Sequence, residues 1–244
     1  MMKAILTGHS RGLGAALAAE LLSRGIPVLA LSRRNNADLA ARYPAALEEV
    51  EIDLSDSTAL GHWLKGDKLR HFLSDCRTIL LINNAGMLQP VGPVETQETA
   101  DIASAVSLNV AAPLMLTSAL AAARGSAELR VIHISSGAGR NPYAGWNIYC
   151  ATKAALDHHA RAVALDNSPG LRLCSLAPGI IDTDMQAEIR ASSPEKFPLH
   201  DRFVALKREG ELAKPVDAAC KLVAYLIGDN FAQQPVADLR EIAV

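Results

Sequence analysis

Aromatic residues and net charge are both scarce in this sequence. Aromatic residues make up 4% of the 244 residues whereas hydrophobic residues make up 50%, so the hydrophobic share is mostly aliphatic. Such a composition favours helices packed on buried parallel strands over a β-sandwich or a β-barrel. The 24 basic and 26 acidic residues leave a net charge of −2, without the positive excess expected of a nucleic-acid-binding protein.

Paired cysteines and a long apolar segment near residue 1 are also missing. The four cysteines lie far apart, with no Cys-x-x-Cys pair, at Cys76, Cys150, Cys174 and Cys220. Since no secretory signal develops before Gly8 either, we expect a cytoplasmic protein with reduced thiols. The seven histidines show no metal-ligand spacing, so no metal site is predicted.

One uncharged stretch, Ile102–Ala123, has the length of a membrane-spanning helix. It contains several Ser and Thr residues together with Asn109 and Pro113, and much of the rest is alanine. A spanning helix needs about 20 predominantly apolar residues. We therefore expect no membrane span here, but a helix buried in the core or at a subunit interface.

Short apolar runs alternate with helical periodicity along the chain. The apolar runs are Lys3–Thr7, Pro27–Leu31, Glu49–Leu54, Thr78–Asn83, Arg130–Ser135 and Leu171–Ala177. The helical stretches are Leu13–Arg24 and residues 56–75, 98–124, 148–167 and 215–227. This alternation predicts an α/β fold with one doubly wound, Rossmann-type parallel sheet, helices on both faces, and a single domain over residues 1–244. The polar segment 182–212 departs from the pattern, and we expect an inserted pair of short helices, or one, that helps to form a substrate pocket.

A glycine-rich turn, Thr7–Gly14, joins the first predicted strand to the first helix. Its Gly-x-x-x-Gly-x-Gly spacing differs from the usual Gly-x-Gly-x-x-Gly fingerprint, but it equally allows a sharp turn and a close approach to a pyrophosphate at a helix N-terminus. The alternative is a glycine turn without a ligand. The predicted cofactor-binding residues of this turn are Gly8, Ser10, Arg11, Gly12, Leu13 and Gly14.

The second predicted strand ends in Ser32, Arg33 and Arg34, with no acidic residue. A free ribose 2′-hydroxyl is usually bound by Asp or Glu at this place, whereas a 2′-phosphate is bound by arginine. The pattern favours NADP(H) over NAD(H), unless one or both arginines are merely solvated.

Two further strand ends point to the same crevice. Asp53 and Leu54 follow one strand, and Asn84, Ala85 and Gly86 follow another. The carboxyl ends of strands line the ligand site of an open α/β sheet. We expect Asp53 to face the adenine and the Asn84–Gly86 turn to brace the glycine turn beneath the adenosine ribose. As isolated peptides, both signals are weak.

Tyr149 and Lys153 are four residues apart, so they share one face of a predicted helix, and Ser136 follows the strand before it. A free tyrosine has a pKa near 10, and a neighbouring ammonium group stabilises the phenolate. Such a tyrosine serves as an acid–base group while the serine holds a carbonyl oxygen. A Tyr/Lys pair alone is usually structural. The glycine turn and the upstream serine make the catalytic interpretation the stronger one.

Taken in chain order, these motifs resemble the short-chain dehydrogenase/reductase family between about residues 4 and 185. They are Thr7–Gly14, Asn83–Gly86, Asn109, Ser136, Tyr149-x-x-x-Lys153 and Pro178-Gly179-x-x-x-Thr183. Further segments are similar to the sepiapterin-reductase-like benzil reductases: Ile134–Tyr143, Gly145-Trp146, Asp184–Ala187 and Asp201–Lys207.

The resemblance implies an NADPH-dependent carbonyl reductase. In that family the counterpart of Tyr149 protonates the carbonyl oxygen and that of Ser136 orients the substrate. Lys153 would bind the nicotinamide ribose and lower the tyrosine pKa, and Asn109 would hold a water of a proton relay. The resemblance also assigns the carboxamide end of the cofactor to Pro178, Gly179, Ile181 and Thr183.

The substrate is expected to be a small, aromatic ketone or diketone. Trp146, Asn147 and Met185 flank the tyrosine and the cofactor turn, and with Ser136 they are the predicted substrate residues. Trp and Met suit an apolar pocket, although ordinary packing also explains them. Sepiapterin reductases anchor the pterin by an acidic residue near the C-terminus, for which Asp238 is available here without a secure alignment.

Two other functions stay open at this stage. A non-catalytic NADP(H)-sensing regulator is the first, although such proteins usually lack the tyrosine or the lysine. The second is a 3-oxoacyl-type reductase, which would need a basic docking patch such as Arg140, Arg190 and Lys196 provide, mixed with acidic residues. The alanine-rich stretches 98–124 and 148–167 suit a homodimer, with a homotetramer as the alternative. The physiological substrate, its stereochemistry and the preferred direction are not fixed by these motifs.

Overall fold

The aliphatic runs form one parallel sheet of seven strands in the computed structural model, which describes residues 1–243. The strands are β1 (Met2–Thr7), β2 (Val28–Ser32), β3 (Leu47–Glu51), β4 (Thr78–Asn83), β5 (Glu128–Ile134), β6 (Leu171–Ala177) and β7 (Val236–Asp238). Their order is β3-β2-β1-β4-β5-β6-β7, and every neighbouring pair is parallel. Because the order reverses between β1 and β4, the loops after these strands open a crevice at their carboxyl ends.

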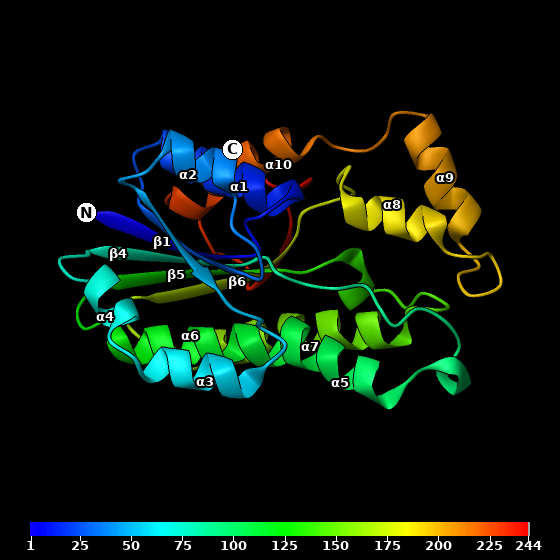
Figure 1. Ribbon diagram of the computed structural model, residues 1–244, viewed down its shortest axis with the longest axis horizontal. Helices are drawn as coiled ribbons and strands as arrows, with labels where there is room; N and C mark the ends of the chain where they lie inside the picture. Colours follow the sequence, from blue (N-terminus) through cyan, green and yellow to red (C-terminus); the bar gives the residue numbers. More distant parts are fainter. Residues whose placement is uncertain (244) are drawn as a thin grey trace.

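Helices cover both faces of the sheet, which explains why a strand such as β2 is buried along its whole length. The face drawn uppermost in Figure 1 is covered by α1 (Gly12–Ser23), α2 (Ala37–Arg42) and α10 (Pro215–Ile227). The opposite face carries α3 (Ser57–Lys65), α4 (Lys68–Phe72), α5 (Thr99–Val106), α6 (Ala112–Ala123) and α7 (Asn147–Leu165). The doubly wound α/β fold predicted from the alternation is thus confirmed.

Two helical stretches differ from the sequence prediction. Residues 56–75 form two helices, because α3 ends at Gly66 and α4 begins after Asp67. Residues 98–124 are interrupted by a π-helical turn, η2 (Ser107–Ala111), which contains Asn109 and separates α5 from α6. The short elements α2 and β7 were not predicted at all.

The uncharged stretch lies within a continuous helical segment, Thr99–Ala123, that is long and apolar enough to cross a membrane by length and composition. In the fold it runs along the sheet beside α7, and Leu116 and Leu120 are completely buried in the core below the sheet. This placement agrees with the predicted core or interface helix.

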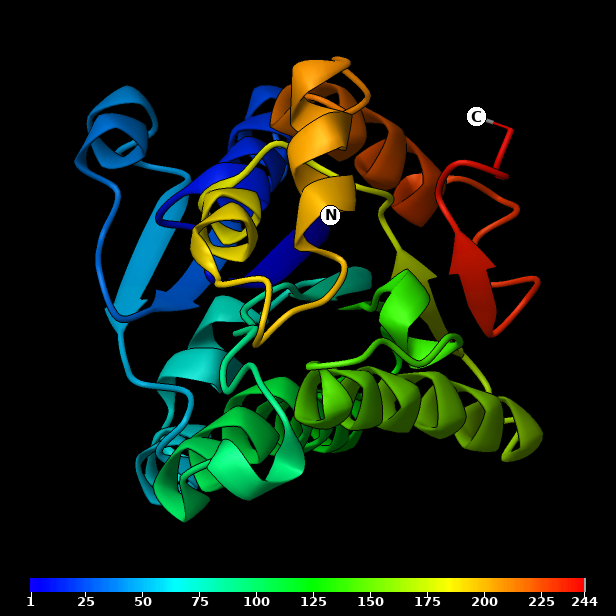
Figure 2. The same cartoon turned by 90° about the vertical axis from the view of Figure 1, so that its right-hand side faces the viewer.

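The polar segment 182–212 forms two helices, α8 (Asp184–Ala191) and α9 (His200–Arg208), within the predicted insertion. Its ends are joined, since the amide of Asp182 donates to the carbonyl of Ala213 at 2.9 Å and the amide of Ala213 donates to that of Ile180 at 2.9 Å. Figure 2 shows α8 and α9 at the end of the sheet where the strands terminate, on the side opposite α7. The insertion therefore roofs the crevice.

Replacing Gly14 by alanine is expected to destabilise the fold. A Cβ at Gly14 would lie 1.9 Å from the carbonyl oxygen of Gly8 and 2.6 Å from Nδ2 of Asn84. Such overpacking costs about 1–3 kcal/mol and exceeds the helix-propensity gain of about 1 kcal/mol. Gly61 in α3 is the matched control, because its nearest neighbour is Cε of Met115 at 3.7 Å. Urea denaturation should show a lower free energy of unfolding for Gly14→Ala and an equal or higher one for Gly61→Ala; equal stability of both variants would contradict the packing argument.

Candidate active site

A cavity of about 1110 Å³ opens at the carboxyl ends of the strands, below α8 and α9. It gathers every predicted cofactor residue: Gly8, Ser10, Arg11, Gly12, Leu13, Gly14, Ser32, Arg33, Arg34, Asp53, Leu54, Asn84, Ala85, Gly86, Tyr149, Lys153, Pro178, Gly179, Ile181 and Thr183. It also gathers Ser136, Trp146 and Met185. Of the predicted site residues, Asn109 and Asn147 do not line it.

The glycine turn is held open by the turn after β4. Gly8 and Gly12 adopt positive φ angles of 73° and 56°, a conformation that favours glycine. The hydroxyl of Thr7 accepts the backbone amides of Asn84 and Ala85, both at 2.9 Å. The side-chain amide of Asn84 in turn donates to the carbonyls of Thr7 at 2.9 Å and Gly8 at 3.0 Å. The expected bracing of the glycine turn is therefore present.

Arginines surround the end of the cavity formed by β2 and β3. Arg33 and Arg34 are exposed at its lining. Arg11 pairs with Asp184 at 3.1 Å, but both side chains are about 70% exposed, so this ion pair adds little stability. Asp53 accepts the amide and the hydroxyl of Ser55 at 2.9 and 2.7 Å. The Ser55 hydroxyl bond, with a smaller contribution from the Arg33 charge, lowers the pKa of Asp53, so this carboxylate is ionised at neutral pH.

Tyr149 and Lys153 lie on the same face of α7, four residues apart, and both are buried. Tyr149 and Ser136 line the same part of the cavity, and the Ser136 hydroxyl is near enough to the phenol to lower its pKa. Nζ of Lys153 lies 5.5 Å from the centre of the Tyr149 ring and donates to the carbonyl oxygen of Ile134 at 2.8 Å. The three side chains predicted to carry the chemistry are therefore assembled at one place.

The pKa of Tyr149 differs from the sequence argument. Burial raises the pKa of the phenol to about 12, against the lowering effect of the Ser136 hydrogen bond. Burial also lowers the pKa of Lys153 to about 8, opposed by the charge of Asp157. Desolvation disfavours both charged forms and exceeds the attraction that was expected to lower the tyrosine pKa. At pH 7 the phenol is therefore neutral and the lysine is still largely an ammonium.

Asn109 lies in the π-helical turn η2 and is 1% exposed. Its side chain accepts the amide of Met87 at 2.9 Å and donates to the carbonyl of Met87 at 2.8 Å and to the hydroxyl of Thr152 at 3.2 Å. A Cβ at Gly86 would lie 3.3 Å from Oδ1 of Asn109 and 3.6 Å from Nζ of Lys153. Asn109 thus supports the Lys153 end of the cavity from behind.

The predicted substrate residues have different surroundings. Trp146 is 4% exposed and stacks on Phe197 with ring centres 4.5 Å apart, so most of the indole is packed and only part of it faces the cavity. Asn147 donates to the carbonyl of Gly92 at 3.1 Å and lies outside the lining. Met185, at the start of α8, lines the cavity.

Further lining residues were not predicted. The apolar and aromatic ones among them come from the roof and from loops, and they are Leu88, Tyr143, Ile189 and Phe203. Polar side chains such as Gln89, Asn141, Gln186 and Glu188 line the cavity as well. One signal could have found part of this wall, since two of only four phenylalanines, Phe197 and Phe203, fall in the inserted segment. These two rings pack with centres 5.4 Å apart, and Phe203 contacts Trp146 at the same distance.

The candidate pterin anchor, Asp238, lines the cavity but is already paired. Its two oxygens accept Nε and an amino nitrogen of Arg240 at 2.9 and 2.7 Å. The hydrogen bond from Arg240 lowers the pKa of Asp238, which keeps this carboxylate ionised. Within residues 1–243, no group of three or more His, Cys, Asp or Glu side chains is arranged to hold a metal ion.

Comparison with known proteins agrees with this geometry. The family described as short chain dehydrogenase matches residues 2–194. A benzil reductase ((S)-benzoin forming) from Bacillus cereus is 37% identical over 249 residues, covering 99% of this chain and 100% of that protein. A sepiapterin reductase from Meriones unguiculatus is 36% identical and covers 93% of this chain and 92% of that protein.

A solved structure extends the comparison to the whole fold. The short-chain dehydrogenase/reductase from Burkholderia vietnamiensis is 46% identical, with a TM-score of 0.73, and the match covers 99% of this chain and 98% of that one. The family match, the full-length relatives and the assembled Ser136, Tyr149 and Lys153 all agree with the resemblance found in the motifs. The chain therefore belongs to the short chain dehydrogenase family and is an oxidoreductase of that family.

Proposed function

We propose that this protein is an NADPH-dependent carbonyl reductase that transfers a hydride to a ketone or diketone of a small aromatic substrate. The observation that carries this proposal is that Ser136, Tyr149 and Lys153 line the same cavity as the glycine turn. A reductase needs a proton donor beside the carbonyl oxygen at neutral pH, and a tyrosine with a pKa of about 12 keeps its proton there.

The residues that line the cavity suit nicotinamide adenine dinucleotide phosphate as the cofactor. The cradle formed by Gly8, Gly12 and Gly14 leaves no room for a Cβ at Gly14 and exposes the N-terminus of α1, where a pyrophosphate is stabilised. Arg33 and Arg34 supply positive charge where the 2′-phosphate of NADP(H) would lie. Bound NADPH supplies the hydride.

The chain's own residues then have distinct tasks. Tyr149 donates its proton to the carbonyl oxygen, and Ser136 holds that oxygen in place by a hydrogen bond. The Lys153 ammonium stabilises the phenolate that is left, and it binds the nicotinamide ribose. Asn109 would hold a water of the proton relay near Lys153. Its side-chain amide is itself fixed by two hydrogen bonds to the backbone of Met87.

The lining favours an aromatic carbonyl compound over a pterin. Met185, Tyr143, Phe203 and the edge of Trp146 form an apolar wall, which suits flat rings. Arg240 donates to both oxygens of Asp238 and would compete with a pterin for this carboxylate. The two benzil reductases among the relatives support the same choice.

A 3-oxoacyl-type reductase is disfavoured, because Arg140 of the expected basic patch is bonded to Asp157 and to the carbonyl of Ala237 instead.

We further propose that the protein is a cytoplasmic homodimer, with a homotetramer as the alternative. The exposed side chains of Val106 in α5 and Leu165 in α7 leave apolar surface on the helices that we expect at the interface. Sedimentation equilibrium should give twice the 25.9 kDa mass of the chain. A mass of one chain at micromolar concentration would contradict the dimer.

Replacing Tyr149 by phenylalanine should abolish the proton donor and leave the cofactor site intact. Loss of a positioned acid lowers turnover by about 10²–10⁴-fold. We expect this loss in kcat for benzil reduction, followed as NADPH oxidation, with an unchanged dissociation constant for NADPH. Near-normal kcat would refute the role of Tyr149.

If the wild-type protein binds NADPH tightly but reduces none of a panel of ketones, diketones and pterins, the sensing function is favoured.

Replacing Arg33 and Arg34 together by glutamine should weaken NADPH and spare NADH. Charge-assisted hydrogen bonds contribute about 1.5–3 kcal/mol each, so kcat/KM for NADPH should fall at least about tenfold. Arg42→Gln is the control, because Arg42 lies over the ring of Tyr43 and does not line the cavity. Equal losses for NADPH and NADH would remove the 2′-phosphate assignment.

A further inference from the structure

A buried carboxylate with no role so far lies one helical turn beyond Lys153. Asp157 on α7 is 1% exposed. Its Oδ1 accepts the hydroxyls of Ser135 at 2.7 Å and Ser175 at 2.6 Å, and its Oδ2 lies 3.2 Å from Nε of Arg140. The carboxylate thus joins α7 to β6 through Ser175, and to the segment that follows β5 through Ser135 and Arg140. Neither Asp157 nor Arg140 lines the main cavity.

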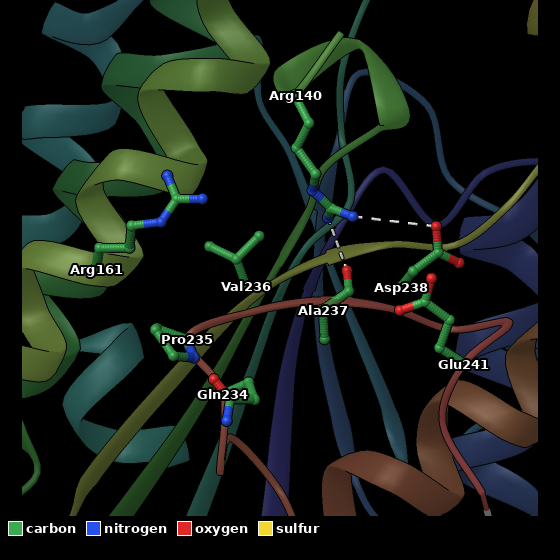
Figure 3. Close-up of a pocket in the computed structure, with 8 residues that line it drawn as sticks. All are labelled: Arg140, Arg161, Gln234, Pro235, Val236, Ala237, Asp238 and Glu241. Atoms are coloured by element: carbon green, nitrogen blue, oxygen red, sulfur yellow. Dashed lines mark hydrogen bonds and ion pairs between the residues drawn. The ribbon is translucent and has the colours of Figure 1, made fainter.

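Arg140 connects this carboxylate to the C-terminal strand. Its terminal nitrogen donates to the carbonyl of Ala237 at 2.8 Å, and a second nitrogen lies 4.0 Å from Asp238. Figure 3 shows the Arg140 guanidinium between the turn and these two residues. The small cavity behind it also contains Arg161, but Arg140 is already satisfied by oxygens of the chain, so the cavity does not define an anion site.

Two of the three partners of Asp157, Ser135 and Arg140, flank the turn that carries Ser136. Ser135 immediately precedes Ser136, and Arg140 follows the short helix η3 (Gly137–Gly139). The turn is also pressed on α7, because a Cβ at Gly139 would lie 3.0 Å from the carbonyl oxygen of Lys153 and 3.1 Å from Oδ2 of Asp157. One carboxylate on α7 therefore fastens both ends of the segment that presents the Ser136 hydroxyl.

We propose that Asp157 and Arg140 are positioning residues that hold Ser136 in register with Tyr149. The inference rests on the proposed reductase function. Tyr149, Lys153 and Asp157 are spaced four residues apart on α7, so the helix that carries the proton donor also carries the anchor of the serine. The distance between the two catalytic side chains is then set by one rigid element rather than by a loop.

A double-mutant cycle tests the proposal. If Arg140 acts through Ser136, Arg140→Gln should lower kcat for benzil about tenfold in the wild-type background and less than twofold in a Ser136→Ala background. KM for NADPH should stay within about twofold, since the cofactor cradle is untouched. Arg140→Lys should restore part of kcat, because one ammonium can still pair with Asp157. Equal factors in both backgrounds, or an unchanged kcat, would overturn the proposal.

Arg130→Gln is the matched control. Arg130 lies at the other end of β5, is 8% exposed, and donates to the carbonyls of Leu226 at 3.0 Å and Gly228 at 2.9 Å. Loss of its charge should lower the thermal midpoint while its effect on kcat, if any, is the same with and without Ser136. A cycle for Arg130 that couples to Ser136 as strongly as that for Arg140 would show general destabilisation and overturn the assignment.

Hydrogen exchange distinguishes failure of the positioning role of Asp157 and Arg140 from failure of the proposed reductase function. Arg140→Gln and Asp157→Asn should both accelerate amide exchange in residues 135–141, and Arg130→Gln should not. This readout needs no turnover. If the wild-type protein does not reduce benzil but exchange is accelerated in the two variants, the proposed benzil reduction is refuted and the positioning role of Asp157 and Arg140 is retained. Unchanged exchange in the two variants would refute the positioning role.

Discussion

The four-residue spacing of Tyr149, Lys153 and Asp157 along α7 is the constraint around which the site is arranged. Each residue faces a different part of the strand ends: Tyr149 lies near Ser136 in the segment after β5, and Lys153 donates to the carbonyl of Ile134 at the end of β5. Asp157 accepts the hydroxyls of Ser135, which follows β5, and of Ser175 in β6. Because one helix holds all three, its position relative to the strand ends determines the whole catalytic geometry. The insertion that roofs the cavity packs on the start of the same helix, where Phe197 stacks on Trp146 with ring centres 4.5 Å apart.

Burial gives these side chains their protonation states. Removal from water raises the pKa of Tyr149 and lowers that of Lys153, so that at neutral pH a neutral phenol and an ammonium group lie together in the cavity. Asp157 is buried as well, yet its two hydroxyl donors and the guanidinium of Arg140 satisfy it. A charge that is fully hydrogen-bonded in this way is tolerated inside a protein.

Local spacing made most of the fold and much of the site predictable. Each of these motifs, such as the glycine turn or the Tyr149–Lys153 pair, spans only a few residues, so its local geometry follows from the periods of helix and strand. The break between α3 and α4 at Gly66 and the three-residue strand β7 are too short to produce a hydrophobic period from which they could be predicted. Contacts such as Asp157 with Arg140, or Trp146 with Phe197, depend on how distant segments meet. The packing of Asn147 against Gly92 and the raised pKa of Tyr149 likewise follow from burial that only the folded chain creates.

The π-helical turn at Asn109 has a consequence for how the chain tolerates changes in length. A π turn bonds residue i to i+5 where a regular helix bonds i to i+4, so η2 holds one residue more than a regular helical path. Deleting a single residue between positions 107 and 111 would let the segment close into an unbroken α-helix. The side chains before and after the deletion would keep their facing, because the π turn had absorbed the extra residue, but the bulge that carries Asn109 would be lost. The extra residue in this segment therefore serves the placement of Asn109 rather than the phase of α6.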